Sequence, residues 1–443
     1  MSASTNKTPD FITLSSYPLA IAHIDCDAFF TSCESARDPK LKGIAIATGK
    51  ERGIVSCPSY EAKALGIRRG MRLTEAKKIC PELVILPSDY ELYSIYSSRI
   101  FAIIRRFTPD VEEYSIDEAF CDLTGLRRLY RASYPAIARR IKEAIQEELG
   151  LTVSVGISLS KTLAKLASKA NKPDGFTAVP GRNLHEFLKE MPLEKVCGFG
   201  PNSAAILNKN GVRTVLDYVK RPQEFARKLL GKIGAELWCE LRGVSVYKLV
   251  TGAKEKYLTI SKSKTFSPAS NNKEFVKGQL LRNMESAFIK LRRHRLSARD
   301  LVAYLRRADF SVTSAAEGRL TRHSSSTLDF TQLCGQLFER IFEDGVTYRA
   351  TGVVLSDIAD EGTDSRDLFE DPVTVEKLKN ISIAVDKVNS YFGKHTLHLA
   401  SSNIVNKKGG HPRNCLAWRK EGLLKGESFR QRVNIPLVNM RVK

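Results

Sequence analysis

Two short segments of this sequence place carboxylates among apolar residues. In the first, Asp25 and Asp27 lie at the end of an apolar strand candidate. In the second, Asp117 and Glu118 are adjacent within a hairpin candidate whose flanking residues are apolar. Three carboxylates from two strands suit a pair of divalent cations, which typically lie about 3.5–4 Å apart and clamp the attacking and leaving oxygens in phosphoryl transfer. Mg²⁺ prefers such oxygen ligands, so carboxylates from these two segments are candidate metal ligands.

Each segment also has an alternative interpretation in which its carboxylates have only a structural role. Asp27 could cap the N-terminus of a helix, or the strand end could simply be solvated. The acidic pair could form a turn in a surface hairpin, although its apolar neighbours favour a hairpin in a core. Adjacent residues of a regular strand point to opposite faces, so the chain must bend for Asp117 and Glu118 to share a site.

Groups that could hold phosphates come from three further places. Lys63 and Lys172 each stand near a predicted helix end, and a triphosphate needs such donors because negative charge develops as pyrophosphate leaves. Gly198 and Gly200 form a Gly-x-Gly turn between short helices, whose backbone N–H groups could hold a phosphate oxygen. The alternatives are exposed surface lysines and a plain helical turn.

The elements that position these residues follow from hydrophobic spacing and from capping and stop signals. In the first half we expect a strand over 19–25, a helix over 89–107, a hairpin around 113–124, a helix over 133–149, a strand over 151–158 and a helix capped by Ser160 that runs to Asn171. Short helices follow over 183–250. Beyond them we expect strands over 258–266, 301–313 and 349–358 and helices over 271–293, 331–344 and 373–391.

Composition restricts the classes of protein. The chain has 443 residues and a net charge of +21, which predicts several domains and a polyanionic partner, with nucleic acid first and an anionic membrane surface as the weaker rival. No apolar run is long enough to span a membrane, and the polar N-terminus does not read as a secretory signal. Nine cysteines without a C-x-x-C pair predict reduced thiols in the cytosol and no zinc ribbon.

Taken together, these segments resemble the Y-family DNA polymerases of the DinB/UmuC branch. The resemblance covers about residues 19–358, in the expected order and spacing. Its matching stretches are HIDCDAFFTSCE (23–34), SYEAKALGIRRGM (59–71), YSIDEAFCDLTG (114–125), VSVGIS (153–158), LAKLASKANKPDG (163–175) and VCGFGPNSAAILNKNGV (196–212).

The resemblance implies an α/β (α+β) multidomain fold, a right-hand polymerase with palm, fingers, thumb and little finger. We expect a flexible tail (1–18), palm (19–30 and 90–182), fingers (31–89), a thumb with a helix-hairpin-helix (183–250), a linker (251–262), the little finger (263–358), an acidic linker (359–371) and a basic C-terminal extension (372–443). The extension resembles UmuC-type members over 386–402, whereas most of the chain resembles DinB.

The resemblance also implies roles for individual residues. It implies Asp25, Asp117 and Glu118, together with the backbone carbonyl of Cys26, as ligands of two Mg²⁺ ions, for which Mn²⁺ could substitute. Phe29 and Phe30 meet the nucleotide, with Phe30 as the steric gate against a ribose 2′-OH. Tyr60, Lys63 and Lys172 contact the triphosphate. Many members carry arginine where this chain has Lys63, so a point charge replaces a planar fork.

Contacts with DNA are expected mainly from the basic region. Residues 251–330 hold 16 Lys/Arg against 7 Asp/Glu, which favours binding to phosphates without sequence preference. The candidates are Gly198 and Gly200 in the thumb, and Lys262, Lys264, Arg292, Arg293, Arg295, Arg306 and Arg307 beyond it. Some of these could be solvated helix charges only.

A further partner is suggested by Leu368 and Phe369, which form an apolar pair in an acidic loop. By resemblance, many relatives carry a peptide here that binds the replicative sliding clamp. Alternatively, the pair pins the following helix onto the little finger.

The leading interpretation is a low-fidelity translesion polymerase. It would use primer-template DNA and dNTPs and act in DNA damage tolerance. We expect no membrane partner, a monomer on DNA, and association with the nucleoid in a bacterial cytoplasm. A catalytically inactive scaffold and another two-metal enzyme, a nuclease or nucleotidyl cyclase, are the alternatives.

Overall fold

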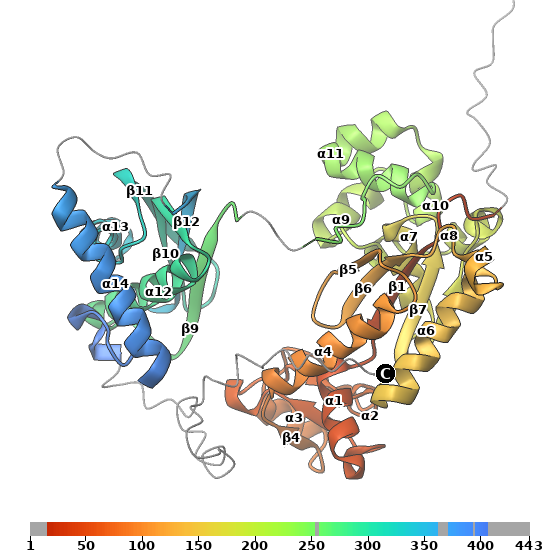
Figure 1. Ribbon diagram of the computed structural model, residues 1–443, viewed down its shortest axis with the longest axis horizontal. Helices are drawn as coiled ribbons and strands as arrows, with labels where there is room; N and C mark the ends of the chain where they lie inside the picture. The colour runs from red at the N-terminus through yellow and green to blue at the C-terminus, as the bar shows by residue number, and fades with distance from the viewer. Residues whose placement is uncertain (1–15, 253–256, 362–370, 393–394, 406–443) are drawn as a thin grey trace, which may run out of the picture. The chain divides into compact units, whose positions relative to one another are not determined.

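The computed structural model describes residues 16–252, 257–361, 371–392 and 395–405. The chain divides into two compact units, Met1–Ala253 and Lys254–Lys443, and each is described by itself (Figure 1). Among the described residues, no helix is both long and apolar enough to cross a membrane.

The first unit is built around a five-stranded sheet with the order β5-β6-β1-β7-β8. The strands are β1 (Ile21–Cys26), β5 (Val111–Glu113), β6 (Glu118–Asp122), β7 (Val153–Ser158) and β8 (Phe176–Ala178). Alternation along β1 sends Ala22 and Ile24 into the main core with helices α4 (Tyr90–Arg105) and α6 (Tyr134–Leu149). Ile21 packs instead with Ala164 of α7 (Lys161–Ala170), and the same alternation puts Asp25 on the α7 face.

Helix α7 lies directly on β7. A Cβ built on Gly156 of β7 would come within 2.2 Å of the Ala164 carbonyl oxygen and the Ser168 amide nitrogen of α7. Only glycine allows this approach of two backbones. Ser160 caps α7 through its hydroxyl, which accepts from the Leu163 N–H at 3.3 Å, as predicted. The helix is therefore held at a fixed depth against the strands that carry the carboxylates.

Two smaller groups of elements complete the first unit. A three-stranded sheet of β2 (Ile46–Thr48), β3 (Cys57–Pro58) and β4 (Val84–Leu86) packs with α2 (Tyr60–Ala64) and α3 (Leu73–Ile79), and α1 (Phe29–Arg37) joins it to β1. The helices α8 (Leu184–Lys189), α9 (Pro201–Lys209), α10 (Val215–Lys220) and α11 (Gln223–Leu241) share one core with the far side of α7.

The second unit contains a four-stranded antiparallel sheet with the order β11-β10-β12-β9. Its strands are β9 (Ile260–Ser270), β10 (Leu296–Arg307), β11 (Thr313–Ser324) and β12 (Tyr348–Asp360), and α12 (Lys273–Arg293) and α13 (Thr331–Ile341) pack against one face. Strand β9 begins inside the predicted linker, and β11 was not predicted at all. β11 is a mostly polar edge strand, so it lacks the apolar alternation that marks a half-buried strand.

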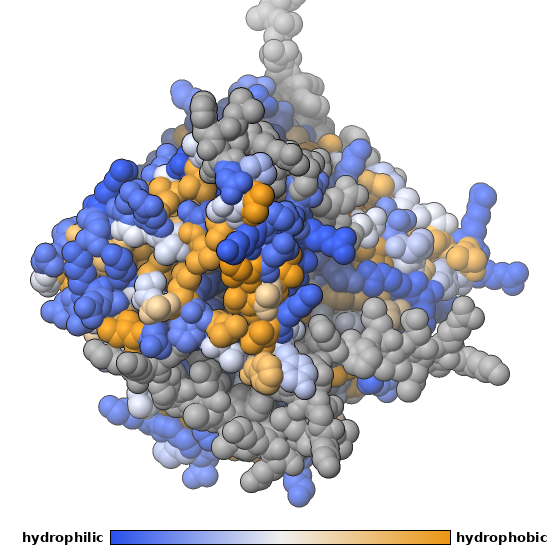
Figure 2. Space-filling model, turned by 60° about the vertical axis from the view of Figure 1, so that its left-hand side comes forward, coloured by the Kyte–Doolittle hydropathy of each residue, from blue (hydrophilic) through white to orange (hydrophobic). Residues whose placement is uncertain are grey.

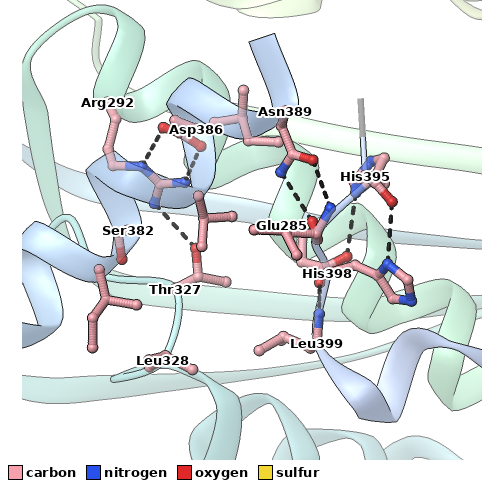
Figure 3. Close-up of a pocket in the computed structure, with 14 residues that line it drawn as sticks. Glu285, Arg292, Thr327, Leu328, Ser382, Asp386, Asn389, His395, His398 and Leu399 are labelled. Atoms are coloured by element: carbon pink, nitrogen blue, oxygen red, sulfur yellow. Dashed lines mark hydrogen bonds and ion pairs between the residues drawn. The ribbon is translucent and has the colours of Figure 1, made fainter. Parts of the chain in front are cut away.

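The described residues that follow β12 also belong to this unit. Helix α14 (Pro372–Phe392) joins α12 through Asp386, and Arg292 of α12 donates to both carboxylate oxygens of Asp386 at 2.6 and 2.9 Å (Figure 3). Buried Glu285, also on α12, accepts from the Leu399 N–H at 2.5 Å and from the Ser402 hydroxyl. These contacts line a cavity of about 280 Å³ between α12 and α14.

The predicted C-terminal extension is therefore, over its described part, an integral piece of the second unit. Figure 2 shows one face of the molecule, on which hydrophobic side chains form a band among mostly hydrophilic ones. Val373, Tyr391 and Phe392 of α14 are among the exposed large hydrophobic residues.

Candidate active site

The predicted carboxylates come together at the ends of β1 and β6. Asp25 is the direct partner of Glu118 in the antiparallel pairing of these strands. The Cys26 N–H donates to the Asp117 carbonyl at 2.9 Å, which fixes the backbone of Asp117 beside the end of β1. The bend that the sequence requires is present: Asp117 lies in the turn between β5 and β6, where two N–H groups donate to the Glu118 carbonyl.

Each of these carboxylates meets a polar partner of the chain itself. Lys172 forms an ion pair with Asp25, and Lys165 lies 2.6 Å from Glu118. The Ser115 hydroxyl donates to Asp117. Across the described residues, no three histidine, cysteine or carboxylate side chains converge closely enough to form a ready metal cage.

The lysines form a ladder that the sequence did not reveal. Lys161 and Lys165 on α7 and Lys172 just beyond it reach the carboxylates of three neighbouring strands. We call the three ion pairs Lys161–Glu112, Lys165–Glu118 and Lys172–Asp25 the lysine ladder. The i, i+4 spacing of Lys161 and Lys165 was the available signal, but it equally fits a solvated helix face.

Burial and like charge act together on Asp25. Burial is the largest cause that raises the pKa of Asp25 to about 6, Lys172 opposes the rise, and the negative charges of Glu118 and Asp117 add to it. Next to it on β1, burial and then the positive charge of Lys165 hold the pKa of His23 well below its usual value. His23 is thus a neutral imidazole beside Glu118, with its Nδ1 2.7 Å from the Ser168 hydroxyl.

Asp27 is a structural brace and does not cap a helix. The residue at the N-cap of α1 is Ala28, in a left-handed conformation with φ 44°. The Asp27 carboxylate instead accepts from the Ser154 hydroxyl and the Asp174 N–H, both at 2.8 Å. The Tyr60 hydroxyl approaches it at 3.4 Å. Asp27 thereby joins β1 to β7 and to the loop that carries Lys172.

The carboxylate group fits hard divalent cations. Its donors are oxygens only, which Mg²⁺ prefers. Burial first, and then the negative charges of Glu118 and Asp117, raise the pKa of Asp25, and a bound cation would favour its charged form. Cys26 is the last residue of β1, next to Asp25. Lysine ammonium groups pair with two of the three carboxylates.

The predicted nucleotide-facing residues lie on α1 and α2. Phe30 stacks on Tyr93 with ring centroids 4.4 Å apart, and Phe29 is buried beside it. On α2, the Lys63 ammonium lies 3.9 Å from the centre of the Tyr60 ring. Burial is the largest cause that lowers the pKa of Lys63, and the nearby positive charge of Lys172 also lowers it.

The two glycines of the Gly-x-Gly turn differ. Gly198 has φ +108°, and an added Cβ would lie 2.9 Å from Leu237, so packing and backbone conformation explain this glycine. Gly200 is the N-cap of α9, and an added Cβ would meet open space. Packing therefore gives no reason for glycine at position 200.

The predicted DNA-binding residues of the second unit differ in exposure and in the partners that they already have. Arg292 is poorly placed to contact DNA, because its side chain is only 8% exposed and already interacts with Asp386, the Ser325 carbonyl and the Thr327 hydroxyl. Lys262 and Lys264 of β9 are the register partners of Val353 and Thr351 of β12, and Lys262 is exposed whereas Lys264 is half-buried.

The remaining candidates lie on β10 and at the end of α12. Arg306 is exposed and lies over the Phe310 ring, and Arg307 pairs with Glu343 at 2.9 Å. Arg293 and Arg295 are exposed at the end of α12. Leu368 and Phe369 lie outside the described residues.

Comparison with known proteins agrees with this arrangement. Residues 24–169 match the impB/mucB/samB family, and residues 258–368 match the C-terminal domain of the same family. The chain is 32% identical to DNA polymerase IV of Desulfatibacillum aliphaticivorans, over 86% of this chain and 96% of that protein. It is also 32% identical to DNA polymerase IV of Caulobacter vibrioides, over 85% and 92%.

A solved structure shares the fold. It is a Y-family DNA polymerase chimera of Dbh and Dpo4, with a TM-score of 0.66 and 22% identity, which covers 77% of this chain and all of that one. The predicted α/β right-hand fold is confirmed by this match. The chain belongs to the impB/mucB/samB family, that is, to the Y-family DNA polymerases of the DinB/UmuC type.

Proposed function

We propose that this chain is an active translesion DNA polymerase, which adds deoxynucleotides to a primer 3′ end on a damaged template by two-metal-ion phosphoryl transfer. The observation that carries the proposal is the pairing of Asp25 with Glu118 across β1 and β6, with Asp117 tied to Cys26 beside them. A catalytically inactive relative would have no need to keep this crowded group of carboxylates, which costs folding free energy.

The elements support an assignment of domains. The five-stranded sheet with α4, α6 and α7 corresponds to the palm, the small sheet with α2 and α3 to the fingers, and α8–α11 to the thumb. The second unit corresponds to the little finger, which we extend to begin at Ile260 and to include α14.

In this proposal the chain's own residues bind the metal ions, the nucleotide and DNA, and exclude ribonucleotides. Asp25, Asp117, Glu118 and the Cys26 carbonyl would hold two Mg²⁺ ions, which when bound activate the attacking oxygen and stabilise the leaving one. Tyr60, Lys63 and Lys172 would contact the triphosphate. The ring of Phe30, fixed by its stack on Tyr93, would clash with a ribose 2′-OH. Exposed Arg293, Arg295 and Arg306 and the Gly200 turn would contact DNA phosphates.

Primer extension tests the proposal directly. The full chain with a primed template and dNTPs should extend the primer in Mg²⁺, stop when EDTA is added, and resume with Mn²⁺. It should also extend past a template lesion. Degradation of the primer without extension would support a nuclease, and no reaction in either metal would support a scaffold.

The remaining assignments concern the setting. We propose that the protein is monomeric on DNA, acts in damage tolerance at the bacterial nucleoid, and is recruited by the sliding clamp through Leu368 and Phe369. Loss of clamp-stimulated synthesis in the double variant Leu368→Ala, Phe369→Ala, with unchanged basal activity and melting temperature, would support clamp binding. A lower melting temperature would support packing instead.

A further inference from the structure

The three rungs of the lysine ladder are not equally fixed. Lys161 and Lys165 extend from within α7, and the Lys165 ammonium also lies over the Tyr114 ring, 4.3 Å from its centre. Lys172 stands beyond the end of α7, after the C-cap residue Asn171. Its side chain is 23% exposed, against 9% for Lys165. Lys172 is thus the rung that can move without disturbing a helix.

The partner of Lys172 in the lysine ladder, Asp25, is also a proposed metal ligand. Lys172 pairs with Asp25, and its ammonium lies 3.7 Å from Asp27. Asp27 already accepts from Ser154 and from the Asp174 N–H, so the carboxylate that depends most on Lys172 is Asp25. In the proposed function, however, Asp25 binds a metal ion and Lys172 binds the triphosphate. Neither role is compatible with a persistent Lys172–Asp25 pair.

We propose that Lys172 is an exchangeable counter-ion, which neutralises Asp25 in the empty site and transfers to the nucleotide triphosphate, leaving Asp25 to the metal ion. This inference rests on the proposed function and adds a coupling to it. The exchange keeps the largely buried Asp25 paired at both ends of the process, which avoids the cost of an isolated buried charge. Nucleotide and metal should therefore each favour the binding of the other, by the same factor.

The first test measures Mn²⁺ binding to the full chain by electron paramagnetic resonance, without DNA or nucleotide. Lys172→Met should tighten binding by about fivefold, the range expected when a competing, partly exposed ion pair is removed. Lys169→Met, an exposed lysine one turn beyond Lys165, should change nothing. Lys172→Gln, with a melting curve for each variant, guards against misfolding.

A second control separates pairing from simple charge. Lys63 is a cation of the same site, but it lies over Tyr60. If Lys63→Met tightened Mn²⁺ binding as much as Lys172→Met, the effect would be general electrostatics and the exchange would be refuted. An unchanged or weaker Mn²⁺ affinity in both Lys172 variants would also overturn it.

The reciprocal test measures binding of a dNTP in EDTA. Asp25→Asn frees Lys172 and should tighten metal-free nucleotide binding severalfold. In the Lys172→Met background the same change should give no gain. A gain that persists there would mean that Asp25 acts only by repelling the triphosphate, against our inference.

The outcomes also separate this inference from the function on which it rests. If the wild-type chain binds Mn²⁺ and Asp25→Asn weakens that binding, the metal site stands, and the Lys172 variants alone decide the exchange. If neither wild type nor Asp25→Asn binds Mn²⁺, the metal assignment fails and the exchange fails with it.

Discussion

Two ion pairs in this chain join distant segments and yet differ in kind. Lys172 reaches Asp25 across 147 residues with a single ammonium group in the candidate active site. Arg292 reaches Asp386 across 94 residues with two parallel hydrogen bonds, while a third guanidinium nitrogen donates to Ser325 and Thr327. A lysine is a point charge on a flexible stem, whereas a guanidinium fork fits one geometry. The comparison suggests that the first pair is built to exchange and the second to stay.

A substitution in the candidate active site should have the largest effect on activity. Glu118→Ala removes a carboxylate and leaves Lys165 without its partner, and we expect primer extension to fall by at least about a thousandfold, in line with the loss of a group that positions charge in phosphoryl transfer. DNA binding, measured by fluorescence anisotropy, should persist. Extension near the wild-type rate would refute the assignment, and Lys169→Met serves as the matched control.

Breaking the fixed pair should change stability and leave chemistry alone. Arg292→Met leaves Asp386 unpaired and should lower the free energy of unfolding of the second unit by about 3 kcal/mol. Arg319 offers a matched control, because it contacts Asp300 with the same two distances, 2.6 and 2.9 Å, but is 58% exposed. Arg319→Met should cost less than about 1 kcal/mol. Equal losses in urea unfolding would mean that burial does not separate the two pairs.

The pH dependence of stability sharpens the comparison at Asp25. Folding raises the pKa of Asp25 to about 6, from a usual value of 3.8. The folded state therefore holds a proton that the unfolded state has lost, and the stability from this group is complete below about pH 4 and is lost as pH rises through about 6. At pH 7.5, Asp25→Asn should consequently raise the free energy of unfolding by about 1–2 kcal/mol, which a higher melting temperature would report. The gain should shrink as the pH falls and close below about pH 4, and a gain independent of pH would contradict this account.

An exposed arginine provides the smallest effect. Arg306→Ala should weaken DNA binding slightly and reduce the slope of log K against log salt by about one phosphate contact. Arg292→Met should leave that slope unchanged, because its guanidinium is already occupied. The salt dependence of anisotropy measures both. A steeper loss for Arg292 than for Arg306 would restore Arg292 as a DNA contact.

The sequence predicted the carboxylates because apolar neighbours marked Asp25, Asp117 and Glu118 as core-bound charges. It also predicted the helix from Ser160 and the bend before Glu118. The pairing of Lys165 with Glu118 could not be predicted from the sequence, because it depends on β6 and β1 lying side by side in the sheet. Arg292 was misread for the same reason: within a basic run it looks like a phosphate contact, and Asp386 lies far away in sequence.

The anchoring of α14 bears on how the second unit could be exchanged between relatives. The match to the family's C-terminal domain ends at residue 368, but Glu285 of α12 takes its hydrogen bonds from Leu399 and Ser402. An added Cβ on Gly278 would lie 2.7 Å from Ile404. A graft cut at residue 368 would carry α12 without the segment that its side chains contact. The transferable unit therefore has to include Leu399, Ser402 and Ile404.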